Sequence, residues 1–171
     1  MFGHWATTLT GCAAAFAALA SAGTTSSNYY LKTHVTDGGD AKFDGLYLES
    51  YHTGAGFSDA TFSSDNTNAI KGFLNDTRQV FDFGNDVVYG MNLNSHYQST
   101  AFTFATIDGG EGDAGFSLDG NSLTWNNTNF AGWLVCDWWH GVPQLFWQLP
   151  YYDIAHPSTC SNITLVTEAS S

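Results

Sequence analysis

Short stretches of alternating apolar and polar residues follow one another along most of the chain, separated by turns rich in Gly, Asn and Asp. Alternation with a period of two is typical of half-buried β-strands, and no stretch keeps the longer period of an amphipathic helix. The pattern predicts strands over 29–35, 43–51, 57–63, 69–74, 79–83, 87–93, 100–107, 115–118, 122–125, 132–138, 144–149 and 162–167.

Two turn sequences strengthen this interpretation, 84–86 (Gly-Asn-Asp) and 119–121 (Asp-Gly-Asn), because each is a hairpin signature between two such stretches. Strands at intervals of about 8–12 residues are typical of all-β folds. We therefore expect a single-domain antiparallel β-sandwich or barrel of about ten short strands. Residues 130–135 weakly resemble residues 43–48, and such an internal repeat leaves a β-trefoil-like fold as an alternative.

The stretch 130–148 holds four of the six tryptophans and is predicted to be the centre of the core. It forms two strands, 132–138 and 144–149, around the turn His140-Gly141-Val142-Pro143. In the first strand, residues 133, 135 and 137 face one way and residues 134, 136 and 138 face the other. Both sets are largely apolar, so we expect this hairpin to be covered on both faces.

Two adjacent indoles at the end of that strand raise the question of a binding surface. Trp138 continues the side of Leu134 and Cys136, so we expect it to be buried. Trp139 then points the other way, and an exposed indole there would suit a neutral glycan or another surface protein. The candidate ligand-binding residues are Trp139, His140, Tyr151 and Tyr152. Packing at a strand end is the alternative.

The N-terminal residues resemble a secretory leader. An apolar run over 9–20 is too short to span a bilayer and ends at Ala20-Ser21-Ala22, a cleavage signal. We expect a signal peptide over 1–22 and one domain over 23–171. Cys136 and Cys160 then form an even pair in an oxidising compartment, which predicts a disulfide worth about 3 kcal/mol. Three acceptor sequons, at Asn75, Asn126 and Asn162, fit a secreted glycoprotein.

Charge narrows the set of partners. The formal net charge is −12, and only three lysines and one arginine are present. Such a surface repels nucleic acid and anionic lipid, so we expect neither nucleic-acid binding nor membrane insertion. Neutral sugars, apolar ligands and cations stay compatible with it. The high aromatic content, 16%, excludes a disordered acidic chain.

One acidic, glycine-rich segment could offer oxygen ligands to calcium. Asp108, Glu111 and Asp113 lie within the run 108–113, which is close to a glycine-rich calcium repeat but does not match the EF-hand pattern. The alternative, which we favour, is an acidic loop whose glycines supply positive φ angles. No cofactor is expected.

Glycoside hydrolysis would need two carboxyl groups across a cleft. The nominal candidates are Glu49, Glu111, Asp137 and Glu168. Aromatic residues surround Asp137, and burial there would raise its pKa, although a strand-end Asp bonded to a turn amide is the plainer interpretation. The chain has no nucleophile elbow, phosphate loop or metal-binding histidine spacing. We therefore do not expect an enzyme.

Several segments carry a resemblance to a known group of proteins. They are 43–48 (F-x-G-L-Y-L), 69–76, the glycine-rich 107–116, 116–125, and the order Phe130, Cys136, Phe146-Trp147, Cys160-Ser161-Asn162-Ile163-Thr164-Leu165. Together they resemble small secreted fungal proteins, including the cell-wall proteins of spore-bearing cells (phialides). The resemblance implies a secreted or wall-associated β-protein without an established enzymatic role, and it carries over no functional residue beyond the two cysteines.

The expected function is therefore that of a secreted, non-catalytic surface, cell-wall or interaction protein with weak glycan binding. The alternative is a small secreted glycan-active hydrolase that uses buried carboxylates such as Asp137.

Overall fold

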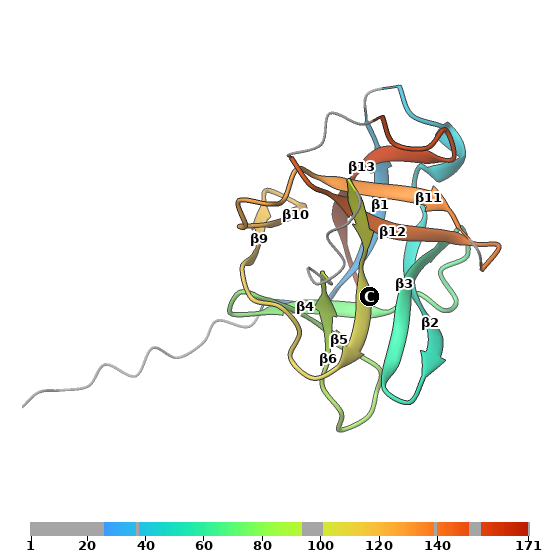
Figure 1. Ribbon diagram of the computed structural model, residues 1–171. Helices are drawn as coiled ribbons and strands as arrows, with labels where there is room; N and C mark the ends of the chain where they lie inside the picture. The colour runs from blue at the N-terminus through green and yellow to red at the C-terminus, as the bar shows by residue number, and fades with distance from the viewer. Residues whose placement is uncertain (1–25, 37, 94–100, 139, 151–154, 171) are drawn as a thin grey trace, which may run out of the picture.

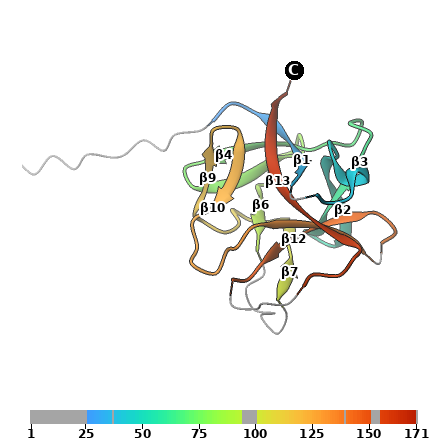
Figure 2. The same cartoon turned by 90° about the horizontal axis from the view of Figure 1, so that it is seen from above.

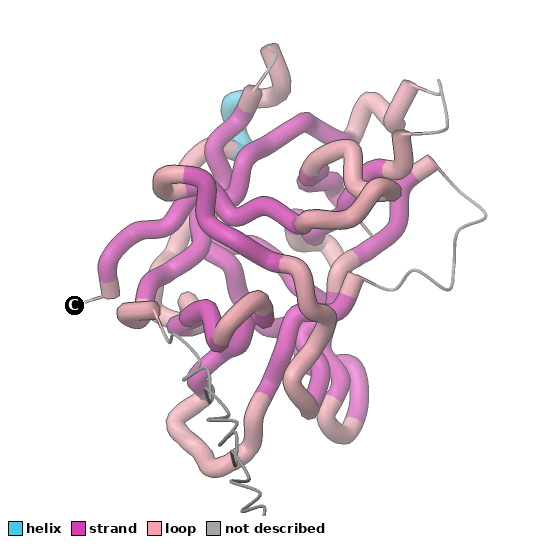
Figure 3. The backbone as a smooth tube through the Cα atoms, turned by 90° about the vertical axis from the view of Figure 1, so that its left-hand side faces the viewer, coloured by secondary structure: helices cyan, strands magenta, loops and turns pink. Residues whose placement is uncertain are grey.

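The fold is all-β, with 55% of the residues that the structure describes in strands and almost no helix. The structure is a computed structural model, and it describes residues 26–36, 38–93, 101–138, 140–150 and 155–170. Figure 3 shows strands throughout, with one short helical turn, η1 (Ala41–Phe43). Within the described residues, no helix is long and apolar enough to cross a membrane.

Thirteen strands follow one another along the chain (Figure 1). Their bounds are β1 Tyr29–Val35, β2 Tyr47–Gly54, β3 Phe57–Ser63, β4 Lys71–Asn75, β5 Arg78–Asp82, β6 Tyr89–Asn92, β7 Phe102–Phe104, β8 Thr106–Gly109, β9 Phe116–Asp119, β10 Ser122–Trp125, β11 Trp133–Asp137, β12 Pro143–Gln148 and β13 Cys160–Ala169.

Nine of these strands close into an antiparallel barrel. The neighbours run β1-β4-β5-β6-β8-β3-β12-β11-β13, and β13 pairs with β1 to close the ring. The remaining strands are additions: β2 pairs with β1 and β3, β7 pairs with β12, and the β9–β10 hairpin extends from β13. The all-β, single-domain prediction is confirmed, and of the two architectures it named the closed barrel is the one that forms. Closure gives the nine barrel strands a partner on each side.

Strand β13 joins the two ends of the barrel. It pairs with β1 over the whole of β1, from Tyr29↔Ala169 to Val35↔Ile163, and its first residues pair with β11. Residues 165 and 166 also pair with β10. Figure 2 shows β13 running beside β1 with the β9–β10 hairpin on its other side. The predicted disulfide is confirmed: Cys136 on β11 and Cys160 on β13 are opposite residues joined by a bond.

The β11–β12 hairpin separates two hydrophobic clusters, as predicted. Trp133 and Val135, with their opposite residues Trp147 and Leu145, point into the barrel and belong to its large core. Leu134, Cys136 and Phe146 point outward and form a second, smaller cluster with Cys160. We call the side that carries this smaller cluster the outer face of the barrel. Figure 1 shows β11 and β12 crossing the upper half of the molecule.

The structure differs from the sequence prediction in two details of strand layout. The predicted strand 100–107 is two strands, β7 and β8, because the chain leaves β12 after Phe104 and joins β3 and β6 from Thr106 onward. The predicted strand 43–51 begins only at Tyr47, because Asp40 caps a 3-10 turn by accepting a hydrogen bond from the Lys42 N–H. Because short strands such as β7 and β8 count separately, the structure has thirteen strands and not the ten or so expected from the sequence.

Candidate ligand-binding site

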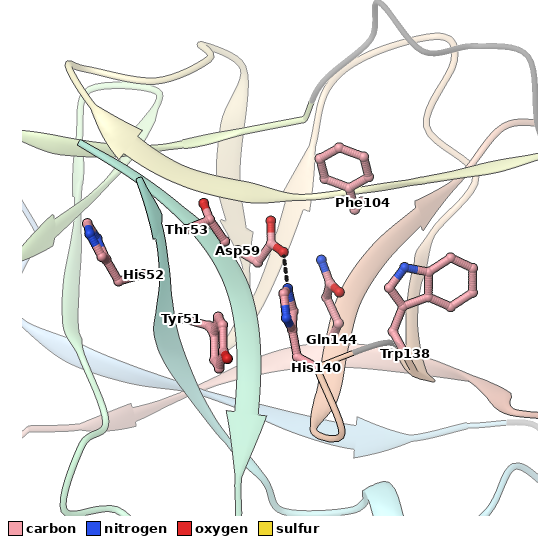
Figure 4. Close-up of a pocket in the computed structure, with 8 residues that line it drawn as sticks. All are labelled: Tyr51, His52, Thr53, Asp59, Phe104, Trp138, His140 and Gln144. Atoms are coloured by element: carbon pink, nitrogen blue, oxygen red, sulfur yellow. Dashed lines mark hydrogen bonds and ion pairs between the residues drawn. The ribbon is translucent and has the colours of Figure 1, made fainter. Parts of the chain in front are cut away.

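A pocket of about 470 Å³ opens on the outer face, between β2, β3, β7 and the β11–β12 turn. Figure 4 shows its lining, which combines aromatic rings with a few polar side chains. The lining residues are Tyr51, His52, Thr53, Asp59, Phe104, Trp138, His140 and Gln144.

Strand alternation places the polar members of this lining outside the barrel. On β3, Ala60 and Phe62 belong to the interior core, so Asp59 points outward. On β12, Leu145 and Trp147 point inward, so Gln144 points outward. The two strands meet at the pair Gln144↔Thr61, which brings these outward side chains to one surface.

The centre of the pocket is an ion pair between a turn residue and a strand residue. His140 Nε2 lies 2.6 Å from Asp59 Oδ2, and both side chains are more than four-fifths buried. Tyr51, which is opposite Asp59 on β2, stacks on the imidazole with ring centroids 4.2 Å apart. Figure 4 shows the three side chains together, with His52 standing apart from them. The ring of His140 is therefore held in place from two sides, and Tyr51 keeps 42% of its surface exposed.

Trp138 forms the opposite wall of the pocket. The expectation that this residue is buried is wrong: 41% of its surface is exposed. Its ring packs edge-on against Phe146, at 5.1 Å between centroids, on the side of the smaller cluster. Because β11 ends at Asp137, Trp138 lies one residue past the last strand pair, where that cluster covers only part of the indole. The face direction was predicted correctly, and the burial was not.

Gln144 lies between these two walls and has an unusual hydrogen-bonding state. The residue is almost completely buried, with 2% exposure, yet the amide oxygen Oε1 has no hydrogen-bond partner in the described part of the chain. Figure 4 shows the amide rising from β12 between His140 and Trp138. Buried acceptors are rarely left unpaired, because an unmade hydrogen bond costs about 1–3 kcal/mol.

The four nominal carboxylate candidates lie in separate settings. Asp137 is exposed and pairs with Lys42 at 2.7 Å, so the expectation that it is buried is wrong. Glu111 pairs with Arg78. Glu168 accepts hydrogen bonds from Lys32 and Tyr47, which hold its pKa below the usual value.

The fourth candidate, Glu49, has a pKa raised above its usual value. Partial desolvation is the main cause, and the nearby negative charge of Asp65 adds to it. Its Oε1 is buried and unpaired. Glu49 is opposite Thr61, one strand away from Gln144, but it does not line the pocket.

The acidic glycine-rich segment does not gather its carboxylates around a common point. Asp108 accepts hydrogen bonds from Thr106 and Asn92, and Asp113 accepts one from the Leu93 N–H. The loop packs tightly on β6, since a Cβ at Gly90 would lie 2.3 Å from the Glu111 carbonyl carbon. Gly110 and Gly112 have the positive φ angles expected for such a loop. In the described part of the chain, no group of three or more His, Cys, Asp or Glu side chains could hold a metal ion.

Of the predicted binding residues, the structure brings His140 into the pocket. Trp139, Tyr151 and Tyr152 lie outside the described residues. Sequence reasoning missed Tyr51, Asp59, Phe104 and Gln144. Alternation around the apolar residues of β3 and β12 could have shown that Asp59 and Gln144 face outward. Their meeting depends on the pairing of β3 with β12, which no local pattern indicates.

The three sequons differ in their surroundings. Asn75, at the end of β4, and Asn126, just after β10, are exposed. Asn162 is partly buried within β13, and its Oδ1 accepts a hydrogen bond of 2.7 Å from Gln148 Nε2. The first two asparagines are therefore open to modification in the folded protein, whereas the third is engaged.

The chain was compared with models of known protein families, with curated proteins and with solved structures. The model of a domain of unknown function (DUF7907) matches residues 26–169. No curated protein and no solved structure matches the chain.

Proposed function

The chain belongs to the family of this domain of unknown function (DUF7907), and we propose that it acts as a secreted, non-catalytic surface or cell-wall protein that binds neutral glycans weakly. The outer-face pocket is the binding site in this proposal. The observation that carries it is the pair of half-exposed aromatic walls, Tyr51 and Trp138, on either side of buried polar groups.

This combination suits a sugar because a pyranose has an apolar face and a polar edge. Aromatic rings supply a flat apolar surface, and a few fixed polar side chains orient the ligand. Among the residues that line the pocket, Asp59 is the one carboxylate, and its charge is directed at His140. The one carboxylate of the lining is thus engaged by a neighbouring side chain, which favours a neutral ligand over an ion.

The non-catalytic part of the proposal follows from the same lining. Glycoside hydrolysis commonly uses two carboxyl groups that face each other across the bond. The described lining contributes only Asp59, and Asp137 lies at the surface beside Lys42. The geometry thus supports binding better than hydrolysis.

Four features support the proposed location. The leader-like residues 1–22 and the three sequons are sequence features of secreted chains. The Cys136–Cys160 disulfide is a bond that persists in oxidising compartments. The resemblance to wall proteins of fungal spore-bearing cells points to the same setting, with a wall glycan as the natural ligand.

The test is a calorimetric titration of the purified protein with neutral gluco-, manno- and chito-oligosaccharides. Trp138→Ala should weaken binding by roughly 10-fold, because it removes an aromatic wall of the pocket. Phe83→Ala is the matched control, since Phe83 is also a partly exposed aromatic residue but does not line the pocket. The proposal fails if no neutral oligosaccharide binds, or if Trp138→Ala binds as well as the unaltered protein.

A further inference from the structure

The most informative single atom in the pocket is the amide oxygen of Gln144. The residue is 2% exposed, it lines the pocket, and Oε1 has no hydrogen-bond partner among the residues that the structure describes. A buried acceptor without a partner destabilises the free protein. Such an atom is therefore a site at which a ligand can supply the missing donor.

Among the described glutamines, Gln144 is the one whose buried oxygen has no partner. Gln148 lies four residues further along the same strand, and its amide donates to Asn162 at 2.7 Å. Gln79 is completely buried inside the barrel, where Oε1 accepts from the Tyr29 hydroxyl at 2.6 Å and Nε2 donates to the Val80 carbonyl. The fold pairs these two side chains with its own groups, whereas Oε1 of the pocket-lining Gln144 has no partner among the described residues.

The position of Gln144 is fixed without help from its side chain. Its backbone is opposite Cys136 on β11 and opposite Thr61 on β3. Cys136 is in turn bonded to Cys160 on β13. The amide is thus presented from a rigid point of the barrel wall, which is the placement that precise recognition of a ligand requires.

We propose that Gln144 Oε1 accepts a hydrogen bond from one hydroxyl of a neutral sugar whose ring lies against Trp138. This assignment rests on the proposed glycan-binding function and adds the residue that sets its specificity. Trp138 binds any ring with an apolar face, whereas Gln144 requires an O–H at one position. A sugar that lacks this hydroxyl, or carries it as a methyl ether, leaves the buried oxygen unpaired and is rejected.

Gln144→Leu tests the proposal, with Gln148→Leu as the matched control on the same strand. In the oligosaccharide titration, Gln144→Leu should weaken binding by roughly 10-fold or more, whereas Gln148→Leu should leave it unchanged. The two variants should also differ in melting temperature, with Gln148→Leu the less stable of the two. Leucine at 144 removes an unpaired buried oxygen, so melting should occur at the same or a higher temperature. Leucine at 148 breaks a formed hydrogen bond, so melting should occur at a lower one.

A second measurement uses the unaltered protein and does not depend on how the variants fold. The best-binding oligosaccharide is compared with its singly deoxygenated and O-methylated analogues. One position should account for a loss of about 10-fold, and that loss should vanish in Gln144→Leu.

The outcomes separate the two proposals. If no oligosaccharide binds, both fail. If Trp138→Ala weakens binding while Gln144→Leu binds normally, glycan binding stands and the assignment of Gln144 is overturned. A lower melting temperature for Gln144→Leu also overturns the assignment, because the oxygen would then be paired in the free protein.

Discussion

The inside of the barrel and its outer face use the same residue types in opposite ways. Inside, Trp147 is fully buried against Trp125, and Gln79 has a partner for both ends of its amide. On the outer face, Trp138 is covered on one side only, and Gln144 has an unpaired oxygen. The inner side chains hold the fold together, whereas Trp138 and Gln144 line a pocket and are available to a ligand. An unpaired buried atom alone does not distinguish the two regions, because the indole nitrogen of Trp147 is also unpaired inside the barrel. Residue type therefore does not reveal the role of a position, but its place relative to the core and the pocket does.

The largest expected effect comes from exchanging the two indoles for alanine. Trp147→Ala should destabilise the protein by about 3–5 kcal/mol, because it empties a closed part of the core. Trp138→Ala should cost less than about 1 kcal/mol, because its ring is already half in water. Denaturant unfolding of both variants measures the difference. Equal losses would show that the outer face is as much a part of the core as the inside.

Next in size is the disulfide, which underlies the outer face and ties β11 to β13. Replacing both cysteines by serine should lower the free energy of unfolding by about 2–4 kcal/mol, because the unfolded chain gains freedom. Thermal unfolding with and without a reductant gives the same comparison in the unaltered protein. An unchanged melting temperature in the double variant would show that the disulfide does not stabilise the folded protein.

A smaller effect is expected from the buried glutamine inside the barrel. Gln79→Leu should cost about 1–3 kcal/mol, because it leaves the Tyr29 hydroxyl without its acceptor. Burial already raises the pKa of Tyr29 well above its usual value, so the hydroxyl stays protonated and needs that acceptor. Urea unfolding beside Gln144→Leu checks the contrast between the two faces. Stabilisation by Gln79→Leu would contradict the structural role of the inner pair.

The smallest effect concerns Glu49, whose raised pKa makes its contribution dependent on pH. In the unfolded chain the carboxyl ionises at its ordinary pKa, whereas in the fold ionisation is opposed by desolvation and by Asp65. Its protonated form thus favours the folded state below the unfolded pKa, and this contribution is lost as pH rises through the folded pKa. Glu49→Gln should therefore raise the melting temperature modestly at pH 7 and leave it nearly unchanged at pH 3. An equal shift at both pH values would show that ionisation plays no part.

Much of the fold was predictable because its signals are local. The two-faced β11–β12 hairpin follows from the alternation of Trp133 and Leu134, and the disulfide follows from the count of cysteines. Burial at strand ends was harder to predict. Trp138 has the expected direction, but nothing in its neighbours along the chain shows that the outer cluster stops short of covering it.

The site itself was only partly predictable. His140 stood out because it lies in a turn beside two tryptophans. Its partners Asp59 and Tyr51 come from a hairpin about eighty residues earlier, and strand pairing between distant segments leaves no trace in local periodicity. The unpaired oxygen of Gln144 is a property of the assembled surroundings, so no sequence pattern could indicate it.

The pairing of β13 with β1 also has a consequence for the order of events during synthesis. The first strand of the barrel is made before all the others, but its long partner, residues 160–169, is made after all of them. Until then β1 lacks its main neighbour, β11 lacks one of its two partner strands, and Cys136 lacks the thiol of Cys160. The nascent chain must therefore carry open strand edges until β13 is made, the period when pairing with another copy competes with closure. A chaperone that shields β1 and β11 during this time should raise the yield of folded protein more than one that acts after release.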